Sequence, residues 1–204
     1  MIAYKTRLCR NRGVAAVEFA LVLPFLLLMS LAVVDFSRFI QAQLIITNVS
    51  REGANMSSRF TPVGDAENVA KGFQAILDGL AASMPPLKMS DFGMIYITEV
   101  TALANNNNNA VTNTVTNQFY WLKGWSGSPN SAIWSCGQWK ADGSCDMGTS
   151  TPTANLMAGE LNAGDQIYAV EVFYNLPSLF GGLQITTNIR VPNIGPILRS
   201  MNVM

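Results

Sequence analysis

A single glutamate stands inside a long apolar run near the N-terminus, five residues after a glycine. The glutamate is Glu18, the glycine is Gly13, and the run from Val14 to Val34 contains no other charge. A carboxylate within a bilayer costs at least a few kcal/mol, so it is normally kept only where it has a partner. A cut after Gly13 would give Val14 an α-ammonium about 6 Å from Glu18 along a helix axis. The spacing therefore favours neutralisation of the two charges, within one subunit or between neighbouring subunits.

The three cysteines fall into two groups on either side of this run. Cys9 precedes it, whereas Cys136 and Cys145 follow it and are separated by eight residues that include the turn sequence Asp142-Gly143. Exported segments meet an oxidising compartment, so we expect a disulfide between Cys136 and Cys145. Closing so short a loop would contribute about 2.7 kcal/mol in the chain-entropy model. A zinc site would need further ligands, and the chain contains no histidine.

Catalytic patterns are weak in this sequence. Residues Gly124 to Ser128 partly resemble a nucleophile elbow, but the fifth residue is serine where glycine is required, and no histidine can act as the base. No P-loop, dinucleotide-binding glycine pattern or zinc spacing occurs. We therefore expect a protein that is not an enzyme and that needs no cofactor and no metal.

Four tryptophans lie close together in the second half of the chain: Trp121, Trp125, Trp134 and Trp139. Exposed aromatic rings can form a binding platform for sugars or partner proteins. Packing in a core or loop is the more frequent use of such residues. We treat the four as a candidate partner or ligand surface, with packing as the alternative.

Four cations and no acid precede Glu18; they are Lys5, Arg7, Arg10 and Arg12. This asymmetry predicts an N-terminus in the cytoplasm and a chain that continues across the membrane. As a helix, the apolar run would extend about 32 Å, the thickness of the hydrocarbon core of a bilayer. Without residues 1–13 the chain keeps nine cations against thirteen acids, a net charge of −4. No basic patch remains for nucleic acid, so we expect none as a partner.

The glycine and glutamate at the head of the apolar run resemble the processing site of type IV prepilins. The stretch RGVAAVEFALVLPFLLL, followed by Asp35, Phe36, Gln43 and the sequence SREGAN from Ser50 to Asn55, resembles the TadE-like family of tight-adherence (Flp, type IVc) pilus proteins. The resemblance covers about the first 55 residues. Beyond them the chain matches only in general character.

The resemblance implies a pilin-like protein anchored in the bacterial inner membrane, with its C-terminal domain in the periplasm. It implies that Gly13, Val14, Glu18 and Phe19 form a processing site for a dedicated prepilin peptidase. Major Flp pilins typically have tyrosine at the position of Phe19, which favours a minor pilin or pseudopilin. The implied partners are other pilin-like subunits and the assembly machinery, and incorporation into the pilus is left open.

Two other uses of the apolar run remain open. An uncleaved signal-anchor carrying an exported ligand-binding or sensory domain would show the same basic flank, although it has no use for Glu18. A cleaved secretory signal is the second alternative, since Ser30-Leu31-Ala32 resembles a small-residue cleavage site. An exported enzyme is a more distant third reading.

Helical periodicity continues beyond the apolar run. Phe36, Phe39, Ile40 and Leu44 share one face, so we expect a single helix from Val14 to about Ser58, kinked at Pro24. This predicts three segments. Residues 1–13 form a cytoplasmic leader, residues 14–59 a transmembrane and spine helix, and residues 60–204 an exported α+β domain.

The exported domain should begin with a short helix and continue as an antiparallel sheet. Asp65 is placed to cap the helix, and Pro85-Pro86 to stop it. The β-forming segments Ile95–Leu103 and Val111–Leu122 predict a hairpin whose connection contains the run Asn105 to Asn109. We expect residues 121–153 to be irregular.

The C-terminal segment should return to strands. Tyr168, Val170, Val172 and Tyr174 alternate and predict one apolar face, which the long helix should cover. We expect Gln184 to Val191 to pair with this strand across a turn at Pro177 to Gly182. The predicted fold class is α+β: a long N-terminal transmembrane helix, a second short helix and an antiparallel sheet.

Overall fold

The computed structural model divides the chain into two compact units, Met1–Ile40 and Gln41–Met204. It describes residues 12–61, 63–104, 111–149, 152–154, 156–177, 184–186, 189–190 and 196–204. Helix α1, Arg12–Arg59, supplies the described part of the first unit and begins the second. The predicted single helix is therefore confirmed, and it continues through Pro24.

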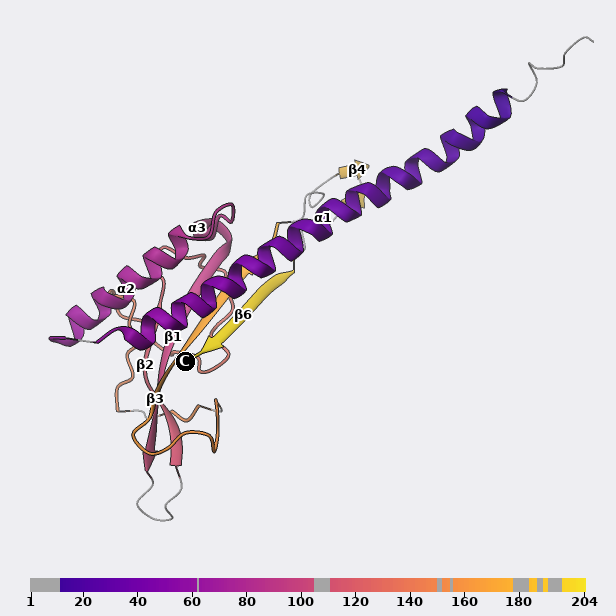
Figure 1. Cartoon of the computed structure of the whole chain (residues 1–204). Helices are drawn as coiled ribbons and strands as arrows, with labels where there is room; N and C mark the ends of the chain where they lie inside the picture. Colours follow the sequence, from indigo (N-terminus) through magenta and orange to yellow (C-terminus); the bar gives the residue numbers. More distant parts are fainter. Residues whose placement is uncertain are drawn as a thin grey trace, which may run out of the picture. The chain divides into compact units, whose positions relative to one another are not determined.

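The second unit contains a four-stranded sheet whose strands all pair antiparallel (Figure 1). The strands are β1, Gly93–Ala104; β2, Val111–Tyr120; β3, Gln166–Asn175; and β6, Ile197–Val203. Their order across the sheet is β2-β1-β3-β6. The predicted hairpin is β1 and β2, although the asparagine run between them lies outside the described residues. The α+β architecture is confirmed.

One predicted strand pairing is wrong. Residues 184–191 do not pair with β3: β4, Gln184–Thr186, pairs with β5, Ile189–Arg190, in a separate two-stranded sheet. The second neighbour of β3 is β6, which places Tyr174 opposite Leu198 and Val172 opposite Ser200. β-propensity identifies residues that suit a strand, but the partner depends on packing that propensity does not contain. Most of the predicted turn at Pro177 to Gly182 lies outside the described residues.

Helix α2, Ala66–Ala82, follows the predicted signals at both ends. The carboxylate of Asp65 accepts a hydrogen bond from the backbone N–H of Asn68 at 3.0 Å, which satisfies one of the unpaired amides of the first turn. The helix ends before Pro85-Pro86, and the short helix α3, Met89–Phe92, leads into β1. The buried residues of α2 form one stripe: Ala70, Phe73, Leu77 and Leu80.

The two helices cover one face of the sheet. Phe73 of α2 stacks on Phe119 of β2 with ring centroids 4.3 Å apart, and its ring also contacts Tyr168 of β3. The second half of α1 packs through Gly53, which lies directly against Val170 of β3. The apolar face predicted for β3 is thus covered as expected. The buried side chains that α1 contributes are Ala42, Ile46, Val49, Ser50, Ala54 and Ser57.

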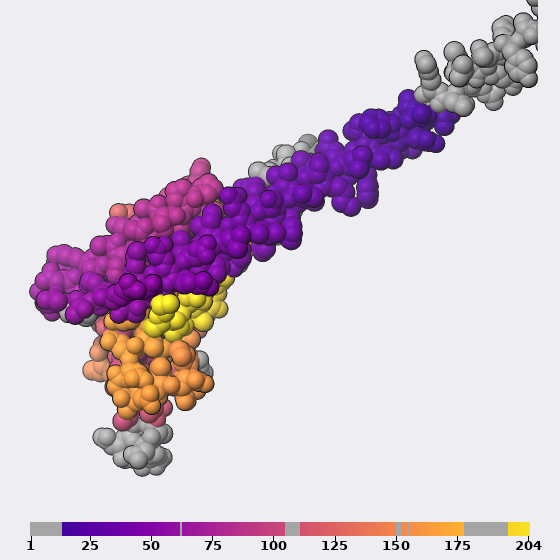
Figure 2. All heavy atoms as spheres, in the orientation of Figure 1, coloured from indigo at the N-terminus to yellow at the C-terminus, as the bar shows by residue number. Residues whose placement is uncertain are grey.

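The long irregular connection between β2 and β3 covers the opposite face. Its residue Ala154 joins Val100, Val115 and Ile167 of the sheet in a buried apolar cluster. β3 is consequently buried on both faces along most of its length. The atoms of β6 lie at the surface of the second unit beside α1, shown in yellow in Figure 2.

Candidate functional site

The residues of the predicted processing site lie in the first two turns of α1. The helix begins at Arg12, so Gly13 and Val14 occupy its first turn and Glu18 lies one turn further on. The first four backbone N–H groups of any helix lack partners within the helix, and this turn is therefore the easiest part of α1 to unwind. Its backbone is the part of the helix that a peptidase could most readily draw into an extended form.

An exposed apolar surface begins in this turn, and Glu18 is its one charged residue. From Val14 to Ser30 every side chain is exposed, including Phe19, Leu21 and Phe25, each more than 60% exposed. The structure has one described helix that is long and apolar enough to cross a membrane, and it is α1. An apolar surface of this length is unstable in water and needs lipid or other helices around it.

Glu18 is exposed within this surface, and none of the described residues donates a hydrogen bond or an ion pair to it. The next carboxylate along the helix behaves differently. Asp35 follows the apolar run and lies 3.4 Å from the guanidinium of Arg38, one turn away. The carboxylate at the end of the run is therefore paired within the chain, whereas the described residues offer no partner to the one inside the run.

The two exported cysteines form the predicted disulfide, with their Cα atoms 5.9 Å apart. Between them the Asp142 carboxylate accepts hydrogen bonds from the backbone N–H of Ser144 at 2.9 Å and from its hydroxyl at 2.6 Å. Burial raises the pKa of Asp142, but these hydrogen bonds outweigh it and leave the pKa below its usual value. The cross-linked turn is thus internally hydrogen-bonded.

The cross-linked turn also protects the outer edge of β2. The backbone N–H of Tyr120 donates to the carbonyl of Gly143 at 3.0 Å, and the N–H of Cys145 donates to the carbonyl of Gln118 at 2.8 Å. Further along the same edge, the N–H of Val115 donates to the carbonyl of Pro152. The disulfide therefore holds a segment that occupies hydrogen-bonding groups which an edge strand would otherwise expose.

The four tryptophans have different surroundings. Trp121 is only 5% exposed, and Trp134 packs against the apolar cluster beneath the long connection. Trp139 lies against Tyr120, with ring centroids 4.7 Å apart. Trp125 is half-buried. Trp121 and Trp134 are therefore packing residues in this structure, which corrects the idea that all four rings are exposed, and the role of the set as a ligand surface stays a prediction.

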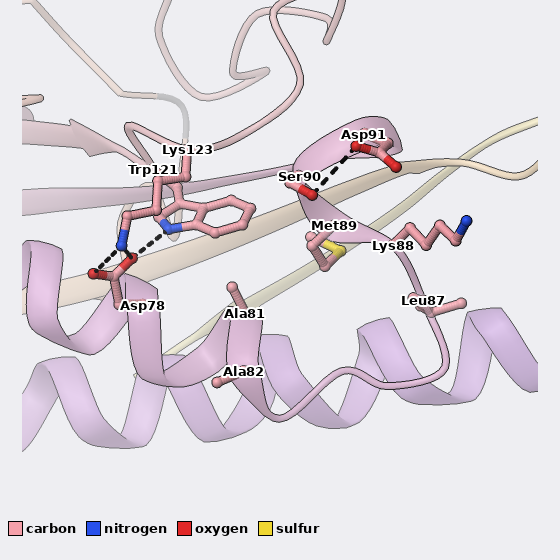
Figure 3. Close-up of a pocket in the computed structure, with 10 residues that line it drawn as sticks. All are labelled: Asp78, Ala81, Ala82, Leu87, Lys88, Met89, Ser90, Asp91, Trp121 and Lys123. Atoms are coloured by element: carbon pink, nitrogen blue, oxygen red, sulfur yellow. Dashed lines mark hydrogen bonds and ion pairs between the residues drawn. The ribbon is translucent and has the colours of Figure 1, made fainter.

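A cleft of about 580 Å³ opens beside α2, and Trp121 contributes to its wall (Figure 3). The indole N–H of Trp121 donates to Asp78 at 2.8 Å, and the ammonium of Lys123 lies 3.0 Å from the same carboxylate. The hydrogen bond from Trp121, helped by Lys123, lowers the pKa of Asp78. Asp78 is thus an ionised group that ties α2 to the segment after β2.

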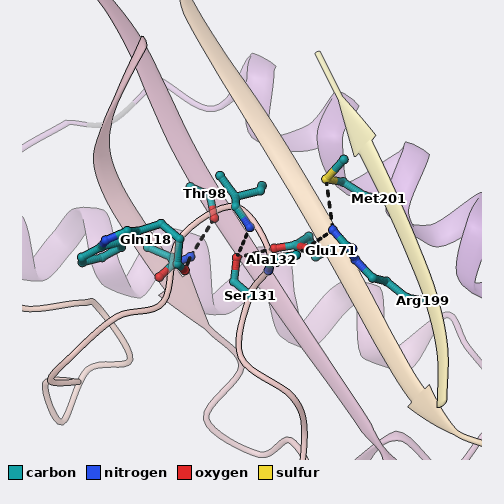
Figure 4. Close-up of polar contacts among 9 residues, drawn as sticks. Thr98, Gln118, Ser131, Ala132, Glu171, Arg199 and Met201 are labelled. Carbon is teal, nitrogen blue, oxygen red and sulfur yellow. Dashed lines mark hydrogen bonds and ion pairs between the residues drawn. The ribbon is translucent and has the colours of Figure 1, made fainter. Parts of the chain in front are cut away.

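A buried ionic network on β3 was not anticipated from the sequence. Glu171 has no exposed surface, and its carboxylate accepts hydrogen bonds from the hydroxyl of Ser131, from the amide of Ala132 at 3.2 Å and from Arg199 at 2.7 Å (Figure 4). The network ties β3, β6 and the long connection together. The sequence did hold a signal, because Glu171 is the single charge in an otherwise apolar β-forming run.

Among the described residues no group of three or more His, Cys, Asp or Glu side chains is placed to hold a metal ion. The described residues instead form structural features. They are an exposed apolar helix with an unpaired carboxylate, and a head held together by packing, one disulfide and one buried ion pair.

Comparison with known protein families gives a match over part of the chain. The sequence model of the TadE-like protein family matches residues 13–55, which include Gly13, Glu18 and the part of α1 that packs on the sheet. No curated protein and no solved structure matches the chain. Over residues 13–55, the segment on which the resemblance rested, the chain is therefore similar to TadE-like proteins, and this match begins at the glycine of the predicted processing site.

Proposed function

We propose that this chain is a minor pilin or pseudopilin-like subunit of a tight-adherence pilus system. It is anchored in the inner membrane by the first part of α1, with its N-terminus in the cytoplasm and its head in the periplasm, and it is cut after Gly13 by a prepilin peptidase. It acts through assembly and has no catalytic activity of its own. Similarity to TadE-like proteins over residues 13–55 suggests the association with the pilus system and the membrane-spanning helix.

The observation that carries the proposal is the carboxylate of Glu18. It lies in the exposed apolar part of α1, and the described residues offer it no partner. A simple anchor gains nothing from a charge that costs a few kcal/mol in lipid. A processed subunit gains a partner, because the new α-ammonium of Val14 on a neighbour can neutralise Glu18 and fix the axial position of one helix against the next.

The position of the proposed cut also supports the proposal. Gly13 lies in the first turn of α1, where the helix is held by the fewest hydrogen bonds. Glycine also has the smallest side chain and the largest conformational freedom, which favours access of a peptidase to this bond. A helix that begins at Val14 would keep the whole apolar run.

Glu18→Gln and Glu18→Ala test the proposal. Both should leave insertion intact, since an amide or a methyl group costs less in lipid than a charge. Both should leave cleavage largely intact, since Gly13 supplies the site of the cut. Both should reduce pilus formation, counted in cells with matched amounts of the protein in the membrane. Asp35→Asn is the control, because that carboxylate already has Arg38 as its partner and follows the apolar run.

Wild-type numbers of pili in Glu18→Ala cells would contradict the charge-pairing role. That result would favour the alternative, in which α1 is an uncleaved anchor for an exported ligand-binding or sensory domain. The cleft lined by Asp78, Trp121 and Lys123 would then be the first place to look for a ligand.

A further inference from the structure

The segment that carries the disulfide folds into a small hairpin of its own. Its two arms are residues 138–140 and 144–146, which exchange two backbone hydrogen bonds of 2.8 Å in an antiparallel arrangement. The bond between Cys136 and Cys145 joins the arms. We call residues 136–146 the disulfide hairpin. It is a unit that is closed on itself before it contacts the sheet.

The second arm of the disulfide hairpin lies along the outer edge of β2. It pairs with the backbone groups of Gln118 and Tyr120. Further along the same edge, the backbone groups of Asn113 and Val115 are paired by residues 152–154 instead. The edge of β2 therefore has two separate covers, and the first of them carries the disulfide.

The disulfide hairpin buries little apolar surface. Within this fully described segment, Cys145 is the one buried apolar side chain. The half-buried ring of Trp139 packs at the sheet against Tyr120 and Tyr96, with ring centroids 4.7 Å and 6.1 Å apart. Segments with few buried apolar contacts open locally at a low cost in free energy. The cross-link therefore supplies a large share of what keeps this hairpin closed.

The two cysteines are unequally exposed. Cys145 is only 6% exposed, whereas Cys136 is half-buried, so a thiolate from outside reaches the sulfur of Cys136 first. The attack forms a mixed disulfide at Cys136 and releases the thiolate of Cys145, which takes up a proton. The second thiol of a dithiol reductant then displaces Cys136 in the same way. The protein gains two electrons and two protons, and the dithiol becomes a disulfide.

We propose that the disulfide hairpin is a redox-operated cover for one part of the β2 edge. In the oxidised protein the hairpin is closed, and the backbone groups of Gln118 and Tyr120 are paired. Reduction by a dithiol releases the hairpin and exposes these groups, while the sheet and the second cover at residues 152–154 stay folded. The inference concerns the head alone and does not depend on the proposed pilus role.

Amide hydrogen exchange with and without a small dithiol tests the cover. The full chain in detergent carries Cys9→Ser, so that only the two exported cysteines respond. Reduction should speed exchange at Tyr120 and Cys145 about a hundredfold, the factor by which closing a loop of this length disfavours its opened form. Val115 and Ala154 belong to the second cover and are the internal controls, whose exchange should change much less. Reoxidation should restore slow exchange.

Cleavage by trypsin gives an independent measurement, because Lys140 lies in the hairpin and Lys123 lies outside it, and both are exposed. Reduction should speed cleavage after Lys140 and leave cleavage after Lys123 nearly unchanged. The double variant Cys136→Ser with Cys145→Ser should behave like the reduced protein and should not respond to the dithiol. Unchanged exchange at Tyr120 on reduction would overturn the proposal, since the hairpin would then stay closed without its cross-link. An equal rise at Tyr120 and throughout β3 would overturn it as well, because the disulfide would then stabilise the head as a whole.

Discussion

Gly53 of α1 lies so close to Val170 of β3 that a Cβ atom at Gly53 would come within 3.0 Å of a Val170 methyl carbon. The same Cβ would lie 2.7 Å from a methyl carbon of Leu80 in α2. Gly53 is thus the point at which the long helix, the second helix and the sheet meet. The glycine belongs to the segment that matches the TadE-like family, so this matched segment includes a packing position as well as an anchor.

Gly53→Val should therefore destabilise the head by about 1–3 kcal/mol, because overpacking a close contact forces neighbours to shift. Gly79→Ala is the matched control: no atom lies within 4 Å of the Cβ it would add, and alanine in a helix should stabilise by up to about 1 kcal/mol. Thermal unfolding of the full chain in detergent, followed by tryptophan fluorescence, measures both. Similar melting temperatures for the two variants would show that α1 does not pack on β3 as described.

The buried pair of Glu171 and Arg199 predicts a non-additive result. Arg199→Met leaves a buried carboxylate without its cation and should cost about 2 kcal/mol, less than for a fully buried pair because the Arg199 side chain is 41% exposed. The double variant Glu171→Gln with Arg199→Met should be more stable than Arg199→Met alone, since no buried charge remains. Denaturant unfolding of the wild type, of Glu171→Gln, of Arg199→Met and of the double variant gives the coupling free energy between the two side chains. If the losses of unfolding free energy in the two single variants simply add in the double variant, Glu171 and Arg199 are not energetically coupled, and the ion pair is ruled out as a source of stability.

Asp78 predicts a pH dependence. Its pKa is lowered by the hydrogen bond from Trp121 and by Lys123, so its stabilising contribution is complete above the ordinary carboxyl pKa. That contribution is lost as the pH falls through the lowered pKa of the folded protein, below about pH 4. Asp78→Asn should therefore remove part of the acid-induced loss of stability. Asp91→Asn, which removes another carboxylate from the same cleft, is the matched control. Identical acid profiles for Asp78→Asn and wild type would contradict this role.

The disulfide predicts a count of reactive thiols. Under denaturing, non-reducing conditions, processed protein should show no reactive thiol, while uncut precursor should show one, Cys9. Replacing Cys136 and Cys145 by serine should cost up to about 2.7 kcal/mol and should promote aggregation, because the turn that covers the edge of β2 is no longer cross-linked. Two or three reactive thiols in the exported protein would remove the disulfide from this account.

Sequence patterns predicted the elements that depend on local signals. The cap at Asp65 marked the start of α2, the apolar run marked α1, and two β-forming segments around an asparagine run marked the first hairpin. Each of these signals lies within or beside the element that it specifies. Local preference was therefore sufficient for them.

Relations between distant segments could not be predicted in the same way. The chain holds two short strand-forming segments after β3, and β-propensity led us to expect residues 184–191 beside β3, whereas the neighbour of β3 is β6. The choice depends on contacts such as Ser50 with Ser200, which join residues 150 positions apart. The network around Glu171 was missed for the same reason, because Ser131 and Arg199 come from separate parts of the chain.

The mass of the N-terminal peptide of the membrane-extracted protein tests the central claim most directly. The account predicts that the processed chain begins at Val14, and that Gly13→Leu blocks this cut and leaves a precursor heavier by the thirteen residues of the leader. Gly79→Leu, at a glycine that lies outside the segment matching the family and has no atom within 4 Å of an added Cβ, is a control that should leave the N-terminus at Val14. A wild-type protein that begins at Met1 in cells that assemble pili, or a Gly13→Leu protein that still begins at Val14, would contradict it.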